Sequence, residues 1–278
     1  SAPTNNDFAA DTNFGNLIFG PTSGPFTIGG NDIVINADGM ITNESTETQT
    51  FNIGIASASP MTFDADEGDL VFNDPITLNG ADGELIVDGD NNTTINGAIG
   101  ESGGTGMVTK NGDGELELAA DNTYTGDTTV TAGRLNLTGT VDGDVVVTGG
   151  TLVLAIDAGI DAGQSLNLNG GALESNNDAR NVANAVNVGG NFAVNAGSDL
   201  ELSGAMGLGA ANRTATINNT LTTFSGQISD GGLTKAGSGK LILNNNANDF
   251  AGGVTLSEGT LGVGADDAVG TGTLTLNG

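Results

Sequence analysis

The stretch Val108-Thr-Lys-Asn-Gly-Asp-Gly-Glu-Leu-Glu-Leu118 recurs with few changes as Leu233-Thr-Lys-Ala-Gly-Ser-Gly-Lys-Leu-Ile-Leu243. After one inserted residue the two stretches stay matched, and Tyr124-Thr-Gly126 aligns with Phe250-Ala-Gly252. Internal repetition of this kind is typical of stacked units that bury one another's apolar faces. The repeat therefore favours a solenoid in which successive units share one core.

Short apolar-x-apolar triplets, each followed by turn residues, run along the whole chain. Examples are Ile33-Val34-Ile35, Leu70-Val71-Phe72, Leu116-Glu117-Leu118 and Leu200-Glu201-Leu202. Because alternate side chains of a strand point to opposite faces, the flanking residues are expected to be buried and the middle one exposed. Strands this short and uniform predict an all-β chain and favour a parallel β-helix, or β-solenoid. The alternative is an antiparallel sandwich of many hairpins, and the repeat favours the solenoid.

Composition excludes several classes of function. The 278 residues hold 34 acidic side chains, 6 basic ones, no His and no Cys, for a formal net charge of −28. Such a surface repels nucleic acid and anionic lipid, which are recognised through Lys and Arg. Without His or Cys, the Ser-His-Asp, Cys-His and zinc arrangements are impossible. No apolar run approaches the roughly 18 residues of a membrane span, so we expect no membrane insertion by this segment.

Calcium is the one cofactor that the acidic side chains suggest, although none is expected to be required. Oxygen ligands suit Ca²⁺, and the candidate ligands are Asp64, Asp66, Asp69, Asp88 and Asp90. The last two begin with the spacing of an EF-hand loop, but Thr93 then stands where that loop needs Gly. The competing interpretation is that the charges keep the chain soluble and apart from its copies.

The phrase from Thr109 to Leu137 carries a specific set of residues: Thr-Lys-x-Gly-x-Gly-x-Leu-x-Leu, then Asn-x-Tyr-x-Gly, then Gly-x-Leu-x-Leu. It closely resembles the autotransporter-associated β-strand repeat, also called the passenger-associated transport repeat, and Leu233 to Val263 forms a second copy. The resemblance implies a right-handed parallel β-helix outside a bacterium, within large surface passengers that are often adhesins. Because the sequence stops at Gly278 inside such a phrase, we expect the chain to be part of a longer protein.

We expect a single β-solenoid over residues 1–278, with repeat copies at 97–137 and 226–263 and a candidate N-terminal cap at 1–30. Most Phe residues fall in the first 72 positions: Phe8, Phe14, Phe19, Phe26, Phe51, Phe63 and Phe72. They could build that cap, form an apolar end that docks onto a second copy, or fill a wider core.

Together these features predict an extracellular, non-catalytic structural or adhesive fibre segment of the bacterial surface. One alternative is a self-assembling filament or surface-layer subunit, in which copies stack end to end. Another is a polysaccharide-active β-helix enzyme, which needs two carboxylates at a defined separation. Carboxylates are so numerous here that no pair stands out, and the chain has no Trp and one Tyr. The expected partners are a second copy of the chain, or a surface or glycan ligand, and not nucleic acid.

Overall fold

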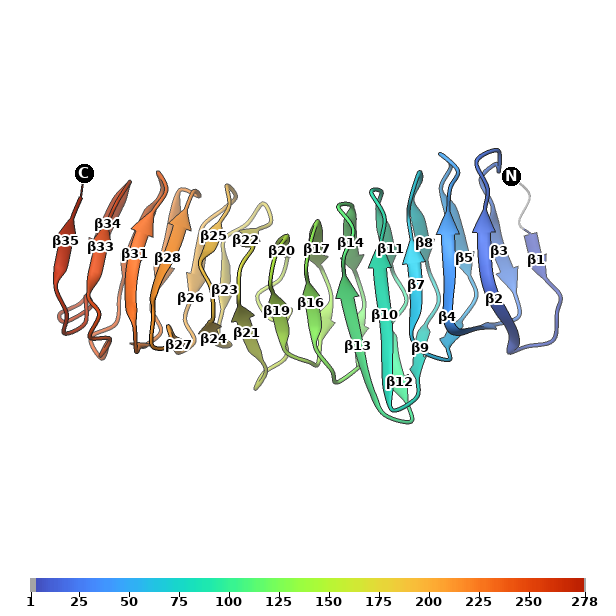
Figure 1. The fold of residues 1–278 in the computed structure, drawn as a ribbon, viewed down its shortest axis with the longest axis horizontal. Coiled ribbons are helices and arrows are strands. Elements are labelled where there is room, and N and C mark those ends of the chain that lie inside the picture. The colour runs from blue at the N-terminus through green and yellow to red at the C-terminus, as the bar shows by residue number, and fades with distance from the viewer. Residues whose placement is uncertain (1–3, 278) are drawn as a thin grey trace. The chain divides into compact units, whose positions relative to one another are not determined.

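The computed structural model describes residues 4–277, and over that range the chain is all β. The described residues contain no helix, and so none that could cross a membrane. The chain divides into two compact units, Ser1–Gly143 and Asp144–Gly278, which are described in turn. In each unit the strands stack in parallel pairs, which confirms the predicted β-solenoid and excludes the antiparallel sandwich (Figure 1).

The first unit has coils with three faces. One face consists of β1 (Thr4–Asn6), β3 (Thr27–Gly30), β5 (Gln49–Asn52), β8 (Leu70–Phe72), β11 (Thr93–Ile95), β14 (Glu115–Leu118) and β17 (Arg134–Leu137). The long strand β4 (Ile33–Asn43) serves both other faces, pairing with β2 (Thr12–Phe19) on one side. The first half of β4 pairs with β6 (Ile55–Ser57), and that face continues with β9 (Ile76–Asn79) and β12 (Ile99–Ser102). The second half of β4 pairs with β7 (Met61–Asp64), and that face continues with β10 (Asp82–Asp88), β13 (Thr105–Lys110) and β16 (Thr128–Val130). A short pair, β15 (Asp121–Asn122) and β18 (Thr140–Val141), follows β12.

The second unit repeats the three-faced plan. Its first face consists of β20 (Thr151–Leu154), β22 (Ala172–Ser175), β25 (Phe192–Val194), β28 (Asn212–Ile217), β31 (Gly232–Ala236), β33 (Val254–Leu256) and β35 (Leu274–Leu276). The second consists of β23 (Arg180–Val182), β26 (Leu200–Leu202), β29 (Leu221–Phe224), β32 (Lys240–Leu243) and β34 (Thr260–Val263). The third consists of β19 (Val145–Val147), β21 (Ser165–Leu168), β24 (Ala185–Val188), β27 (Met206–Gly207) and β30 (Ile228–Ser229).

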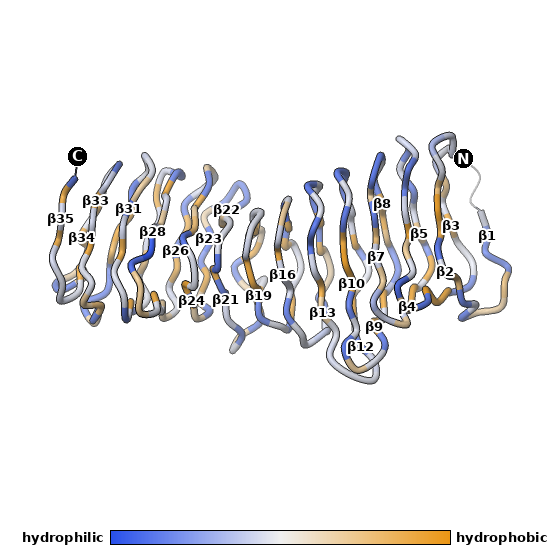
Figure 2. Tube along the Cα trace, in the orientation of Figure 1, coloured by the Kyte–Doolittle hydropathy of each residue, from blue (hydrophilic) through white to orange (hydrophobic). Residues whose placement is uncertain are grey.

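The core of each unit is a set of columns in which one apolar residue lies on the next. In the first unit Phe51 pairs with Phe72, Phe72 with Ile95 and Ile95 with Leu118, and all four are buried. A comparable column of Leu152, Leu173, Val194 and Ile217 fills the second unit. Figure 2 shows hydrophobic residues, in orange, interspersed with hydrophilic residues, in blue, along the strands, as the triplets predict.

The aromatic residues of the N-terminal third are divided between core and surface. The rings of Phe63 and Phe72 stack with centroids 4.0 Å apart, and those of Phe51 and Phe72 with centroids 4.8 Å apart. By contrast Phe8 is 59% exposed and Phe26 38% exposed. The three later Phe residues, Phe51, Phe63 and Phe72, are therefore part of the core. The cap at residues 1–30 stays a prediction, and its first three residues lie outside the described range.

The turn glycines of the repeat allow neighbouring coils to touch backbone to backbone. A Cβ added to Gly114 would lie 1.9 Å from the carbonyl oxygen of Asn91 in the preceding coil. The same position in the second copy, Gly239, would bring its Cβ to 2.1 Å from the carbonyl oxygen of Asn219. Only glycine fits there without moving one coil away from the next.

We expect Gly114→Ala to lower the free energy of unfolding by about 3 kcal/mol, because the new methyl group overlaps a backbone oxygen that cannot move alone. Gly207→Ala is the matched control, since its Cβ would meet no atom within 4 Å. That control should change stability by less than about 1 kcal/mol. Guanidinium unfolding monitored by circular dichroism measures both, and equal midpoints for the two variants would contradict the close-contact explanation.

Candidate functional site

Each repeat buries a lysine whose ammonium group lies among backbone carbonyls. Lys235 is 0% exposed, and its Nζ donates to the carbonyl oxygens of Ala236, Gly237 and Glu258 at 2.9, 2.6 and 3.0 Å. Its partners come from its own coil and from the next one, so the side chain joins two coils. Lys110 occupies the same position in the first copy, is 1% exposed, and donates to the carbonyl oxygen of Gly112.

Burial lowers the pKa of both lysines below their ordinary value of 10.5, since desolvation disfavours the charged form. Acidic neighbours oppose that effect, Asp88 and Asp113 at Lys110 and Glu258 at Lys235. The charge of each lysine is thus compensated by carbonyl dipoles and by carboxylates. No proton-transfer partner for either ammonium group lies among these contacts.

Each repeat also buries an asparagine that bonds to the coils on both sides. The Oδ1 atom of Asn122 accepts from the backbone N–H of Ile99 at 2.9 Å, and its Nδ2 donates to the carbonyl oxygen of Thr140 at 2.9 Å. In the second copy Asn248 accepts from the N–H of Ile228 at 2.7 Å and donates to the carbonyl oxygen of Ala268 at 2.7 Å. These side chains satisfy backbone groups that the core would otherwise leave unpaired.

The aromatic side chain of each repeat is fully buried. Tyr124 and Phe250 are both 0% exposed. The Tyr124 hydroxyl lies 2.5 Å from the hydroxyl oxygen of Thr128, and burial raises the pKa of the phenol. The Lys, Asn and aromatic positions of the repeat are therefore all buried, and the Asn of both copies and Lys235 also join neighbouring coils.

The outward faces carry polar side chains in axial ladders, as stacked turn asparagines permit. The Nδ2 atom of Asn73 donates to Oδ1 of Asn52 at 2.7 Å, and that of Asn96 donates to Oδ1 of Asn73 at 2.8 Å. In the second unit Asn187 donates in the same way to Asn167 at 2.9 Å. The ladders run along the coils and leave part of each amide open to solvent.

Of the five candidate calcium ligands, the structure brings Asp64 and Asp88 side by side, as register partners on β7 and β10. Asp66 and Asp90 lie in the turns that follow these strands. The carboxylate of Asp69 has a different partner: its Oδ1 accepts from the backbone N–H of Asn92 at 3.0 Å. Within residues 4–277, no three acidic side chains are grouped so that they could hold a metal ion. The calcium site stays a prediction of the sequence.

The carboxyl group of Asp64 is the electrostatic centre of this acidic region. Partial burial raises its pKa above the ordinary 3.8, and the charges of Asp66, Asp88, Glu44 and Asp90 raise it further. The folded chain therefore holds the Asp64 proton to a higher pH than the unfolded chain does. Stability contributed by this group is present at low pH and is lost as the pH rises through the raised pKa.

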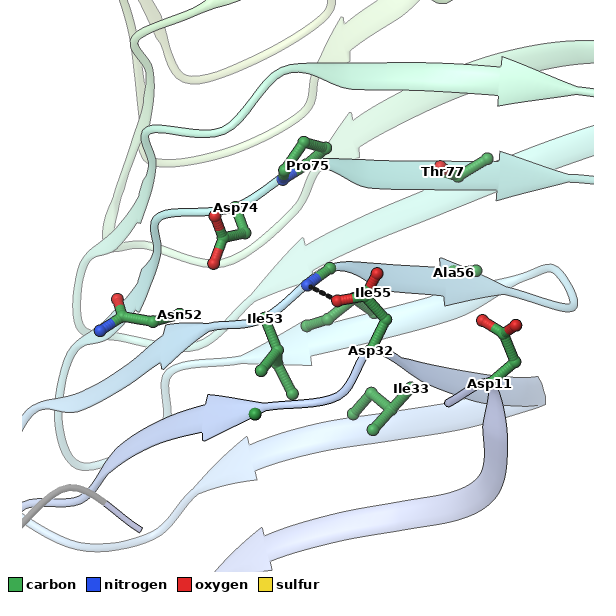
Figure 3. Close-up of a pocket in the computed structure, with 12 residues that line it drawn as sticks. Asp11, Asp32, Ile33, Asn52, Ile53, Ile55, Ala56, Asp74, Pro75 and Thr77 are labelled. Carbon is green, nitrogen blue, oxygen red and sulfur yellow. Dashed lines mark hydrogen bonds between the residues drawn. The ribbon is translucent and has the colours of Figure 1, made fainter. Parts of the chain in front are cut away.

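A groove of about 400 Å³ lies on the surface of the first unit (Figure 3). Asp11, Asp32 and Asp74 line it from three different turns, and Asp32 Oδ1 accepts from the N–H of Gly54 at 2.7 Å. Figure 3 shows that the three carboxylates do not converge on one point. No sequence motif marks this groove, because turns far apart in the sequence form it.

Two segments of the chain, residues 108–137 and 233–263, match the Passenger-associated-transport-repeat family. The chain carries two passenger-associated transport repeats. In both, the Lys, Asn and aromatic residues of the repeat are the buried side chains described above, and the Asn bonds to the coils on both sides. Over 104 residues the chain is 36% identical to the adhesin BmaC autotransporter of Brucella suis biovar 1 (strain 1330). That alignment covers 34% of the chain and 3% of the relative, so the chain spans a small part of that protein's length. No solved structure matches the chain.

Lys235→Met should lower the free energy of unfolding by about 3 kcal/mol, because three carbonyl oxygens of a passenger-associated transport repeat lose their donor inside the fold. Lys240→Met is the control: it removes the same charge from an exposed position on the neighbouring strand. Chemical unfolding of both variants gives the comparison. Equal loss in the two would mean that net charge, and not the buried contact, sets the effect.

Asp64→Asn should raise the melting temperature at pH 7 by up to about 3 °C, since the neutral amide does not suffer the burial and repulsion that raise the pKa of the carboxyl group. Asp82→Asn, at the exposed start of β10, should leave it unchanged. The gain should vanish as the pH falls toward 3.8, where the carboxyl group of the wild type is protonated.

The same melts test the calcium prediction. A Ca²⁺ site at Asp64 requires the wild type to gain more from added Ca²⁺ than Asp64→Asn does. A melting temperature that Ca²⁺ leaves unchanged would discard the site.

Proposed function

We propose that this chain is an adhesive, non-catalytic segment of a passenger exposed on, or secreted from, the bacterial surface. The observation that carries the proposal is how the chain uses its polar side chains. The polar residues that define the repeat are buried between coils, as at Lys235 and Asn122, and the outward faces are left free for contact. The local similarity to a relative named as an adhesin supports the same function.

The charge of the chain supports particular classes of adhesive contact. A net charge of −28 repels anionic surfaces at long range, and salt weakens that repulsion. Contacts are therefore made with neutral or cationic groups, by hydrogen bonds from exposed amides, hydroxyls and carboxylates. Repetition compensates for weak single contacts, because many sites on one scaffold raise the overall avidity.

A non-catalytic function is supported by the side chains that are present. The chain has no His and no Cys, so general bases poised near neutral pH and thiol nucleophiles are lacking. Glycoside cleavage by paired carboxylates is the remaining route. In the groove of Figure 3, the carboxylates diverge and one of them is bonded to a backbone N–H.

Beads coated with the full chain test the adhesive function. We expect them to attach to at least one of three surfaces (cultured epithelial cells, extracellular-matrix protein, neutral polysaccharide) several-fold more than beads coated with the heat-unfolded chain. Beads coated with serum albumin control for a negative coat, and assays at two salt concentrations separate charge repulsion from specific contact. Attachment no greater than both controls on all three surfaces would refute the proposal.

A further inference from the structure

A second groove, of about 300 Å³, lies on the outer face of β23, β26 and β29 in the second unit. This volume is at the lower end of the range of ordinary small-ligand sites. Its polar lining is of both charge signs: Asp157, Arg180, Asn181, Asp199, Glu201 and Thr223. No sequence motif marks any of these as a site residue.

Strand register brings the lining together. Asn181 pairs with Glu201, and Glu201 pairs with Thr223, so the three lie on adjacent strands of one sheet. Neighbouring strands are about 4.8 Å apart, and this spacing places the three side chains in a row across the sheet. Leu221 lies one strand from Leu200 and Glu201 and gives the groove an apolar patch.

Several groups in the groove keep hydrogen-bonding capacity. The Oε1 atom of Glu201 accepts from the Ser225 hydroxyl, which leaves Oε2 open. Asp157 Oδ1 accepts from the N–H of Asn181 at 3.0 Å, which leaves its second oxygen open. Among the described residues, the carboxylate of Asp199 and the Nδ2 amide of Asn181 have no protein partner.

Arg180 and Asn181 also contain buried polar atoms without partners. These are Nε of Arg180 and Oδ1 of Asn181, adjacent residues on β23. Such atoms are rare in folded proteins and each costs free energy. The guanidinium group has one partner in the described chain, Asp178 Oδ2 at 3.2 Å, and the Asp178 side chain is 77% exposed. Both side chains are thus held at the groove by packing, with few hydrogen bonds of their own.

These groups select a class of ligand. Three carboxylates against one guanidinium group disfavour an anion such as a uronate. A divalent cation is disfavoured too, because no three acidic side chains in residues 4–277 are grouped as metal ligands. What remains is a neutral molecule that both donates and accepts hydrogen bonds and has an apolar face, which describes a neutral saccharide.

We infer that this groove binds a neutral saccharide. Glu201 and Asp199 accept from sugar hydroxyls, Asn181 and Arg180 donate to them, and Leu221 lies against a C–H face of the ring. The inference deepens the proposed adhesive function, on which it rests for its biological setting. With no aromatic platform in the groove, the single-site affinity is low, and surface density provides the avidity.

The full chain is titrated with maltotriose, cellotriose and chitotriose, and with trigalacturonate as the anionic probe, while side-chain and backbone amides are followed by nuclear magnetic resonance. At least one neutral trisaccharide should shift the Asn181 side-chain amide and the backbone amides of β26. Glu201→Gln and Asp199→Asn should each weaken that binding about tenfold, as expected for loss of a charged hydrogen-bond acceptor.

Glu117→Gln is the matched control. Glu117 is the middle residue of the other Leu-Glu-Leu triplet and accepts from the Thr138 hydroxyl, as Glu201 accepts from Ser225. It should bind saccharide as the wild type does, and melting curves check that all three variants fold. The inference is overturned if no neutral trisaccharide shifts these amides, if Glu201→Gln binds as the wild type does, or if trigalacturonate binds more tightly.

The bead assay separates this inference from the proposed function. A chain that binds a neutral saccharide at these amides but attaches to no surface supports the groove and contradicts the adhesive function. A chain that attaches to surfaces but binds none of the neutral trisaccharides overturns the groove and leaves the adhesive function standing.

Discussion

Parallel pairing in register is the constraint on which everything else in this structure depends. Each coil satisfies its backbone N–H and C=O groups mainly with the coils on either side, so a residue is stacked on its equivalent one coil later. Residues of the same type therefore stack on one another, as Phe51 does on Phe72 in the core and Asn73 on Asn96 outside it. Some backbone groups at the turns pair instead with the buried Lys and Asn side chains.

The sequence contained enough information for the fold. The triplets predicted burial at Leu116 and Leu118 with Glu117 outside, and the structure agrees. The two repeat copies also pair alike, Val108 with Thr128 and Leu233 with Val254. The burial of Lys110 was missed, although alternation places it inward, two residues after Val108. Inside the fold, its ammonium group donates to the carbonyl oxygen of Gly112.

The sites were far less predictable, because they depend on turn lengths that differ from coil to coil. Asp64 and Asp88 were singled out as acidic residues, and only the register of β7 and β10 makes them neighbours. Asp69 was grouped with Asp64 by spacing alone, yet its carboxylate bonds to the N–H of Asn92. Asn181, Glu201 and Thr223 share no motif, and only the register of β23, β26 and β29 makes them neighbours.

The asparagine that reaches both neighbouring coils has a mechanical consequence. A solenoid pulled along its axis from one end peels coil by coil, since each coil is held mainly by the next. At Asn122 one side chain crosses two gaps, to Ile99 on one side and Thr140 on the other. Rupture at either gap must break this side-chain bond together with the backbone bonds there. Each repeat is therefore a point of raised tensile strength, where the solenoid resists unravelling.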